Sequence, residues 1–331
     1  MIRHSLMAAL FLSAVALPAA AQEKVLRFAN FIPPNVSYSV VFQEFADAVT
    51  RDSGGALKIQ MYHGGTLGSN SSQQLKLVQD GVADMAFIVT SLTANRFPET
   101  EVTEVPFLVR NAREGARALW KLNDKGMLPS YADLKLLGLI TTSAQVLNSR
   151  APVKSLEDLK GLRLRVTGGL GLEAVKALNA APVQIGGGEV AESLSRGVID
   201  GLLGEPDFIK TFKMQRFVKH HTLVPFGAPT MLVAMRKDAY DALPAAARAA
   251  LDKHAGLAFS EKWAANNMAG NSGGLQTFKD EGNIVTELDA AEAAKWQAAL
   301  KPVVDGWLAK RPENPKMYEA MQQALREVRA Q

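Results

Sequence analysis

Hydrophobic and polar positions follow two periods along the first 235 residues. Residues 24–29 and 57–62 alternate with a period of two, which is typical of half-buried strands, and residues 84–89 form a short apolar run typical of a buried strand. Apolar residues at helical spacing predict helices over 39–51 and 73–79. Strand and helix keep alternating to about residue 235, and this pattern predicts α/β layers.

The last quarter of the chain has a different pattern. From residue 243 it is rich in Ala, Lys, Glu and Gln with helical periodicity over 245–269, 290–309 and 315–329. Pro244 and Pro315 both suit the first turn of a helix, where a missing N–H costs nothing. We therefore expect this region to be mostly helical.

Two segments of the chain resemble each other. Residues 77–85 and 193–201 each read as a helix that ends on glycine, followed by an aspartate that opens an apolar strand. Glycine suits the helix end because it adopts positive φ easily. If the likeness is not chance, it predicts two similar α/β lobes, whose strand ends face a shared crevice where ligands bind.

The N-terminus predicts export from the cell. Arg3 precedes an apolar run over residues 5–17, and Ala19, Ala20 and Ala21 form a small-residue cleavage site before Gln22. The run is too short for a permanent transmembrane helix, and no later stretch approaches the roughly 20 apolar residues that one needs. Residues 1–21 are therefore predicted to be a signal peptide, and the mature protein to be soluble in the periplasm.

Composition narrows the classes of function. The 331 residues carry 37 Lys and Arg against 33 Asp and Glu, a formal net charge of +4 that is mixed along the chain. This balance indicates neither nucleic acid nor an anionic membrane as a partner. The chain has no cysteine, which excludes a thiol nucleophile and a cysteine zinc site.

Motifs for catalysis or metal binding are absent from the sequence. It contains no H-E-x-x-H, G-x-S-x-G or Walker-type loop. His220 and His221 would point to opposite faces of a strand and make a poor metal pair, so we expect no metal and no cofactor. Glu205 and Asp207 could form the acid/base pair of a periplasmic hydrolase or lyase, but no motif supports the opposed protonation states that this chemistry needs.

Arg163 and Arg165 are the charged residues with the clearest chemical potential. On the strand predicted around residues 162–166 they share one face. An arginine at a strand end facing a cleft is suited to bind a carboxylate through two parallel hydrogen bonds. A pair of solvated edge arginines fits the pattern equally well, and periodicity does not choose between the two interpretations.

Several ordered motifs resemble those of the solute-binding proteins of TRAP transporters, the DctP family. The likeness covers nearly the whole mature chain, and the segments that carry it are residues 64–68, 79–85, 105–108, 148–153, 158–166, 188–190 and 193–201. The resemblance implies two α/β lobes joined by crossing strands and a long helix. We place one lobe at 22–143 plus about 230–272, and the other, with the C-terminal helices, at 144–229 plus about 273–331.

The resemblance also implies a function without catalysis. Such proteins close around a small organic acid and deliver it to a small and a large TRAP membrane subunit, and the position of Arg165 binds the ligand carboxylate. An enclosed guanidinium without a partner is costly, which agrees with that role. A sensor that reports ligand to a membrane receptor is the alternative among binding proteins. We expect a monomer, because the protein must dock, release and diffuse.

The sequence departs from the family at three places near the expected site. Gln145 stands where many relatives that bind acidic sugars or dicarboxylates carry a second arginine, residues 202–208 replace a Gln-Glu-Asn-Pro motif, and Gly187 replaces a bulky residue. These changes favour a monocarboxylate with an apolar, aromatic or 2-oxo/hydroxy body. The ligand-binding residues predicted with Arg165, all near expected strand ends, are Phe31, Thr90, Ser91, Gln145, Glu205, Phe208 and Phe226.

Overall fold

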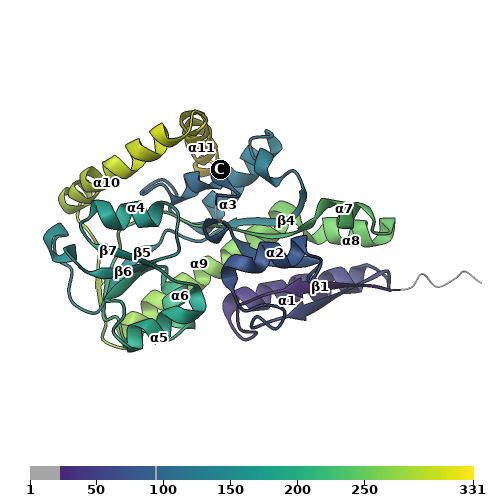
Figure 1. The fold of residues 1–331 in the computed structure, drawn as a ribbon, viewed down its shortest axis with the longest axis horizontal. Coiled ribbons are helices and arrows are strands. Elements are labelled where there is room, and N and C mark those ends of the chain that lie inside the picture. Colours follow the sequence, from purple (N-terminus) through teal and green to yellow (C-terminus); the bar gives the residue numbers. More distant parts are fainter. Residues whose placement is uncertain (1–22, 94) are drawn as a thin grey trace, which may run out of the picture.

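The structure is a computed structural model, which describes residues 23–93 and 95–331. The predicted signal peptide at residues 1–21 lies outside the described residues. Elsewhere the alternation of strands and helices predicted from the sequence is confirmed, and the strands form two sheets side by side (Figure 1).

The first sheet has the strand order β2-β1-β3-β10-β4. Strands β1, β2 and β3 are parallel, and β10 lies antiparallel between β3 and β4. Burial on both faces explains the apolar sequence of β3, whose five residues are all buried. The strands of this sheet are β1 (Lys24–Ala29), β2 (Leu57–Tyr62), β3 (Met85–Val89), β4 (Leu134–Thr141) and β10 (Thr230–Arg236).

The second sheet has the strand order β11-β9-β5-β8-β6-β7. Strand β6 is parallel to β7 and β8, whereas β5 is antiparallel to β8 and β9. The strands of this sheet are β5 (Val146–Ser149), β6 (Arg163–Val166), β7 (Ala181–Gln184), β8 (Gly201–Gly204), β9 (His220–Thr222) and β11 (Ile284–Thr286).

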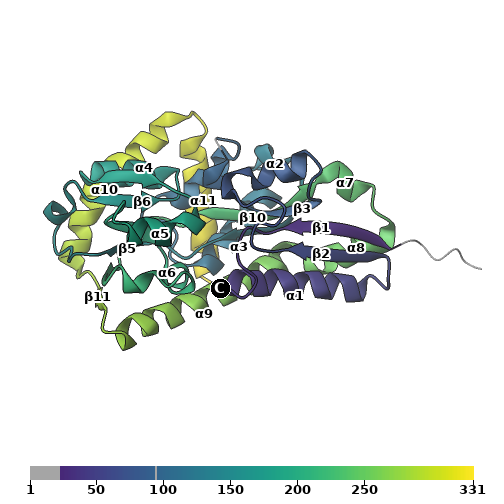
Figure 2. The ribbon, with the colours of Figure 1, turned by 60° about the horizontal axis from the view of Figure 1, so that its bottom comes forward.

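Helices cover the two sheets and connect them. Helix α9 runs from one sheet to the other (Figures 1 and 2), α10 packs on α4 beside the second sheet, and α11 packs on α3. The helices are α1 (Ser37–Asp52), α2 (Gln74–Gln79), α3 (Ala112–Asp124), α4 (Leu170–Ala177), α5 (Val190–Ser195), α6 (Pro206–Thr211), α7 (Lys237–Asp241), α8 (Ala245–His254), α9 (Gly256–Asp280), α10 (Ala290–Lys310) and α11 (Asn314–Arg329). Within the described ranges, no helix has the length and hydropathy needed to cross a bilayer.

One helix prediction was wrong. The periodic run over 245–269 is two helices, because Ala255 is extended and Gly256 has φ +74°. The chain turns at this point: α8 packs on α1, and α9 continues to Asp280 in contact with α3 and α6. Helical periodicity continues through the turn because both helices bury apolar residues.

The two sheets share one topology. The segment β1-α1-β2-α2-β3 corresponds to β6-α4-β7-α5-β8, with the same strand order and direction in each sheet. An antiparallel strand then lies beside the third parallel strand in both, β10 in the first sheet and β5 in the second. The similarity of residues 77–85 and 193–201 therefore reflects a repeated structural unit.

An arginine–aspartate pair repeats with that unit. The Arg27 backbone N–H and Nε both donate to Asp84 Oδ2, at 2.7 and 3.0 Å, while the Asp84 N–H donates to the Arg27 carbonyl at 3.0 Å. Arg163 and Asp200 make the same three bonds at 2.9, 2.9 and 2.8 Å. Arg27 lies in β1 and Asp84 directly precedes β3, whereas Arg163 lies in β6 and Asp200 directly precedes β8. Each pair therefore joins two neighbouring parallel strands of its sheet.

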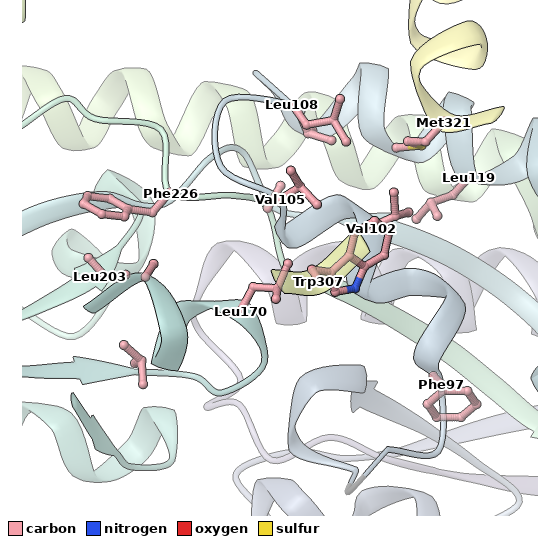
Figure 3. Close-up of a cluster of buried hydrophobic side chains, with 14 of the residues drawn as sticks. Phe97, Val102, Val105, Leu108, Leu119, Leu170, Leu203, Phe226, Trp307 and Met321 are labelled. Carbon is pink, nitrogen blue, oxygen red and sulfur yellow. The ribbon is translucent and has the colours of Figure 1, made fainter. Parts of the chain in front are cut away.

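A buried apolar cluster packs between elements of both sheets (Figure 3). The segment Pro98–Glu104 and the residues after it contribute from the side of the first sheet, and α4 and β8 contribute from the second. Helices α10 and α11 complete the cluster. Its labelled members are Phe97, Val102, Val105, Leu108, Leu119, Leu170, Leu203, Phe226, Trp307 and Met321.

Candidate functional site

A cavity of about 70 Å³ lies between the two sheets. By the 10–15 Å³ that one water needs, it has room for roughly five waters, the size range of a small organic molecule. Both sheets contribute to its wall, and most of the wall is apolar. The lining residues are Phe31, Ile32, Tyr38, Ser71, Phe87, Val89, Leu92, Thr142, Gln145, Arg165, Thr167, Gly187, Gly204, Glu205, Phe208 and Met231.

The cavity continues into a wider groove of about 830 Å³. The two share Phe31, Ile32, Ser71 and Leu92, so the groove adjoins the cavity directly. One part of its wall comes from the second sheet and the segment after it, and consists of Gln184, Ile185, Gly186, Gly188 and Glu189. This groove gives a ligand a route from solvent to the cavity.

Arg165 is the cation of the cavity wall. It stands near the carboxyl end of β6 and is only 4% exposed. Its Nε donates to the Ile185 carbonyl at 3.0 Å, and its guanidinium carbon lies 5.4 Å from the centre of the Phe208 ring, within the range of a cation–π contact. Among the described residues no acid forms an ion pair with it. Burial lowers the pKa of Arg165 to about 10.

This arrangement is suited to binding an anion. The guanidinium has five N–H donors, and the bond to Ile185 uses one of them. A buried charge without a partner is costly, and a carboxylate that accepts two parallel N–H bonds would offset that cost. Among the residues that line the cavity, Arg165 supplies the positive charge and Glu205 the negative charge.

Aromatic rings form the apolar part of the wall. Phe31 and Phe87 are stacked, with ring centres 5.5 Å apart and planes 17° apart. Phe208 lies beneath Arg165 and contacts Phe212, and Gly187 faces its ring. A Cβ on Gly187 would stand 3.4 Å from that ring, so a bulky residue there would project toward Phe208. Because Gly187 has no side chain, the ring of Phe208 forms this side of the cavity wall.

Glu205 is the one lining residue with a negative charge, and its carboxylate is held by three donors. Tyr38 Oη donates to its Oε1, and the side-chain amides of Asn267 and Asn271 donate to its Oε2 at 3.0 and 3.2 Å. Burial raises the pKa of Glu205 to about 7, although the hydrogen bonds from Tyr38 and Asn267 oppose that rise. The pKa of Tyr38 is raised as well, chiefly by burial and then by the charge of Glu205.

Five of the eight residues predicted from the sequence line the cavity: Phe31, Gln145, Arg165, Glu205 and Phe208. The other three lie elsewhere. Thr90 is buried and donates to the Thr230 carbonyl at 2.9 Å. Ser91 is partly buried, and its hydroxyl is enclosed. Phe226 lies in the apolar cluster (Figure 3), where its ring contacts that of Trp296. Gln145 turns its amide to Thr167 Oγ1 at 3.3 Å.

Asp207 does not line the cavity beside Glu205. It accepts a hydrogen bond from Ser37 Oγ at 2.7 Å, and it packs against Gly270 of α9. The two acids therefore do not face the cavity together, as the acid/base pair of a hydrolase would.

Sequence reasoning missed Tyr38, Phe87, Thr142, Thr167 and Met231. A usable signal existed for three of them: Tyr38 lies in the first turn of the helix that follows β1, and Thr142 and Thr167 directly follow β4 and β6. All three positions belong to the edge of a sheet where strands end and ligands bind. Phe87 and Met231 lie inside strands, and their place in the wall depends on how the sheets sit together.

A two-lobed α/β fold with a cavity between its two sheets is typical of solute-binding proteins. The chain belongs to the bacterial extracellular solute-binding proteins of family 7, DctP, whose sequence model matches residues 28–311. The family predicted from the sequence motifs is thereby confirmed.

Known proteins of this family align with most of the chain. The C4-dicarboxylate-binding periplasmic protein DctP of Rhodobacter capsulatus is 28% identical over 306 residues, which is 88% of this chain and 89% of that protein. A TRAP solute-binding protein of Rhodoferax ferrireducens T118, solved with copurified benzoate, has a TM-score of 0.88 at 25% identity and covers 92% of this chain and 98% of its own. Another solved relative is a marine metagenome TRAP solute-binding protein, from an unidentified microbe, that is specific for aromatic acid ligands. Its TM-score is 0.88 at 24% identity, and the match covers 92% of this chain and 99% of its own. At this identity it supports the fold alone.

Proposed function

We propose that this protein captures a small organic monocarboxylate in the periplasm and delivers it to the small and large membrane subunits of a TRAP transporter. The ligand has an apolar, preferably aromatic, body. The protein acts as a monomer and as a receptor without catalysis. Its two lobes, 22–143 with about 230–272 and 144–229 with about 273–331, close around the ligand because the ligand contacts residues from both.

The observation that carries this proposal is the buried guanidinium of Arg165 in an otherwise largely apolar wall. One cation favours one carboxylate, and the Phe31–Phe87 stack with Phe208 favours a flat apolar body. Benzoate in the Rhodoferax relative supports the same ligand class. The dicarboxylate named for the Rhodobacter relative is disfavoured here, because the other charged residue in the wall is the acid Glu205.

A thermal-shift screen of the protein without residues 1–21 tests the proposal. The panel contains aromatic and aliphatic monocarboxylates, dicarboxylates and sugar acids. A ligand at 100 times its Kd stabilises the folded state by about 2.7 kcal/mol, which gives a clear rise in Tm. We expect the largest shifts from aromatic monocarboxylates. If only dicarboxylates or sugar acids raise the Tm, the proposed ligand class is wrong.

Ligand retained through purification would hide such a shift. The protein is therefore unfolded, washed and refolded before the screen, and the wash is analysed by mass spectrometry. An aromatic monocarboxylate in the wash would support the proposal directly, and a dicarboxylate or sugar acid there would contradict it.

A further inference from the structure

Glu205 and Tyr38 present acceptors to the cavity. The Tyr38 hydroxyl has one hydrogen, and it is committed to Glu205, so toward a ligand the Tyr38 oxygen acts as an acceptor. The three donors to Glu205 leave part of its acceptor capacity unused. Both residues line the cavity with Arg165. The wall thus has a donor group at Arg165 and an acceptor group at Tyr38 and Glu205.

Glu205 is held rigidly in this place. It lies between the end of β8 and the start of α6. The backbone of the next residue, Pro206, packs closely on Gly274 of α9: a Cβ added to Gly274 would stand 2.6 Å from the Pro206 carbonyl. Asn267 and Asn271, one turn apart on α9, then reach Oε2. Glu205 therefore cannot turn away when an unsuitable ligand group comes near.

We propose that Glu205, fixed by Tyr38, Asn267 and Asn271, is a specificity determinant that admits a hydroxyl or other hydrogen-bond donor of the ligand and rejects a second carboxylate. A donor on the ligand would complete the acceptor capacity of Tyr38 and Glu205, whereas a second carboxylate would meet the like charge of Glu205, which is only 3% exposed. The inference rests on the proposed function, which requires one carboxylate on the ligand. It adds which second polar group the ligand can carry.

The test compares acids that differ in one ring substituent. Calorimetry measures Kd for benzoate, for 3- and 4-hydroxybenzoate, and for benzene-1,3- and 1,4-dicarboxylate. We expect the better hydroxybenzoate to bind at least as tightly as benzoate. At pH 8 both dicarboxylates should bind about tenfold more weakly than benzoate, because like charges repel and only the roughly one-tenth of the protein in which Glu205 is protonated then accepts a second carboxylate.

Three variants separate the contributions. Glu205→Gln keeps the shape of the side chain and removes its charge, and it should reduce the dicarboxylate penalty at pH 8 to about twofold or less. Tyr38→Phe leaves the Glu205 charge in place, so it should weaken the hydroxybenzoates relative to benzoate and leave dicarboxylates excluded. Glu189→Gln is the matched control, because Glu189 lies exposed in the adjoining groove; it should change none of the ratios.

The outcomes separate this inference from the proposed function. If benzoate binds and Glu205→Gln leaves the dicarboxylate penalty unchanged, the inference is wrong and the proposed function stands. If none of the five acids binds the wild-type protein, the inference is wrong, and so is the preference for an aromatic body; the capture of a monocarboxylate is then decided by the wider panel of the thermal-shift screen.

A pH measurement on the wild-type protein replaces the Glu205→Gln arm if that variant does not fold. The titratable groups that face Glu205 are Tyr38 from α1 and Asp207 from α6, and α9 presents the neutral amides of Asn267 and Asn271. Glu205 gains a proton as the pH falls from 8 to 6, so the Kd of the dicarboxylate divided by the Kd of benzoate should fall toward one over this range. A ratio that is constant over this range overturns the inference.

Discussion

Arg163 and Arg165 stand two residues apart on β6 and have opposite surroundings. The side chain of Arg163 is 46% exposed and pairs with Asp200, with 2.7 Å between Nη2 and Oδ1. Arg165 is buried in the cavity wall and bonds the Ile185 carbonyl. The exposed arginine joins two strands, and the buried one is available to a ligand.

This difference gives a prediction for binding. Arg165→Ala should weaken binding of a carboxylate ligand by at least about 30-fold, because truncating one partner of a buried charge pair costs 2–5 kcal/mol. Arg163→Ala removes a neighbouring arginine of the same strand and should change Kd by less than about threefold. Calorimetry with the best acid from the thermal-shift screen measures both. Equal losses in the two variants would contradict the assignment of Arg165.

Arg165 should also reduce the stability of the ligand-free protein. Its charge is buried, and none of the acids in residues 23–93 and 95–331 forms an ion pair with it; replacing buried ionic groups with apolar ones of similar size is often neutral or stabilising. Arg165→Met should therefore raise the free energy of unfolding by about 1 kcal/mol in the absence of ligand while it removes binding. Urea denaturation of the refolded, ligand-free proteins measures the difference, and a less stable Met variant would show that the guanidinium has a structural role.

Two helical glycines should respond in opposite ways to alanine. Gly274 lies on α9 against Pro206, whereas Gly306 on α10 has open space around its added Cβ. Gly306→Ala should stabilise the protein by about 0.5–1 kcal/mol, the usual gain in a helix interior. Gly274→Ala should destabilise it by about 1–3 kcal/mol, because the backbone of α6 would have to move. The shift should also weaken ligand binding, because Glu205 adjoins Pro206. Thermal and urea unfolding, with calorimetry, test the pair.

His221 should make stability depend on pH. It is buried and stacked on Phe278, with ring centres 3.7 Å apart, and its Nδ1 lies 2.7 Å from Asn148 Oδ1. Burial, and then the neighbouring charges of His220 and Lys219, lower the pKa of His221 from 6.5 to about 3. Between pH 6.5 and pH 3 the unfolded chain therefore binds a proton that the folded protein does not, so stability is present above pH 6.5 and falls as the pH is lowered.

The expected size follows from that window. Between pH 6.5 and 5.5 this residue should cost about 1 kcal/mol of unfolding free energy, because each pKa unit corresponds to 1.36 kcal/mol. Urea denaturation at the two pH values measures the loss in the wild type and in His221→Gln. Whatever the absolute stability of the variant, its loss of unfolding free energy between the two pH values should be smaller by that amount. An equal pH slope in both proteins would contradict the prediction.

Local patterns predicted the repeated units well. The bounds of β1 and β2 agree with the alternating runs, and the glycines that end α2 and α5 have φ near +70°, as a residue that ends a helix requires. These features depend on residues near in sequence. The position of β10 depends on pairing with β3 and β4, far away in the chain, and no local pattern reveals it.

The site could be predicted only in part for the same reason. Glu205 was predicted from its place near an expected strand end, whereas Arg165 was assigned through the family resemblance, because the strand pattern alone did not choose between a ligand-binding and a solvated arginine. In the structure each lies at the end of a strand in the second sheet. Phe226 also lies in a segment between two strands, but that segment crosses from one sheet to the other and turns its ring toward Trp296 of α10. Which way a crossing segment turns its side chains depends on tertiary packing.

The position of β10 has a consequence for the order in which the molecule can fold. Residues 230–236 supply a strand between β3 and β4, so the first sheet stays split until more than two thirds of the chain is available. Such long-range pairing makes folding slow. The predicted signal peptide would send the chain through a membrane translocon unfolded. Slow completion of the first sheet would favour that passage, because the N-terminal part cannot finish a stable sheet while the rest is still being synthesised.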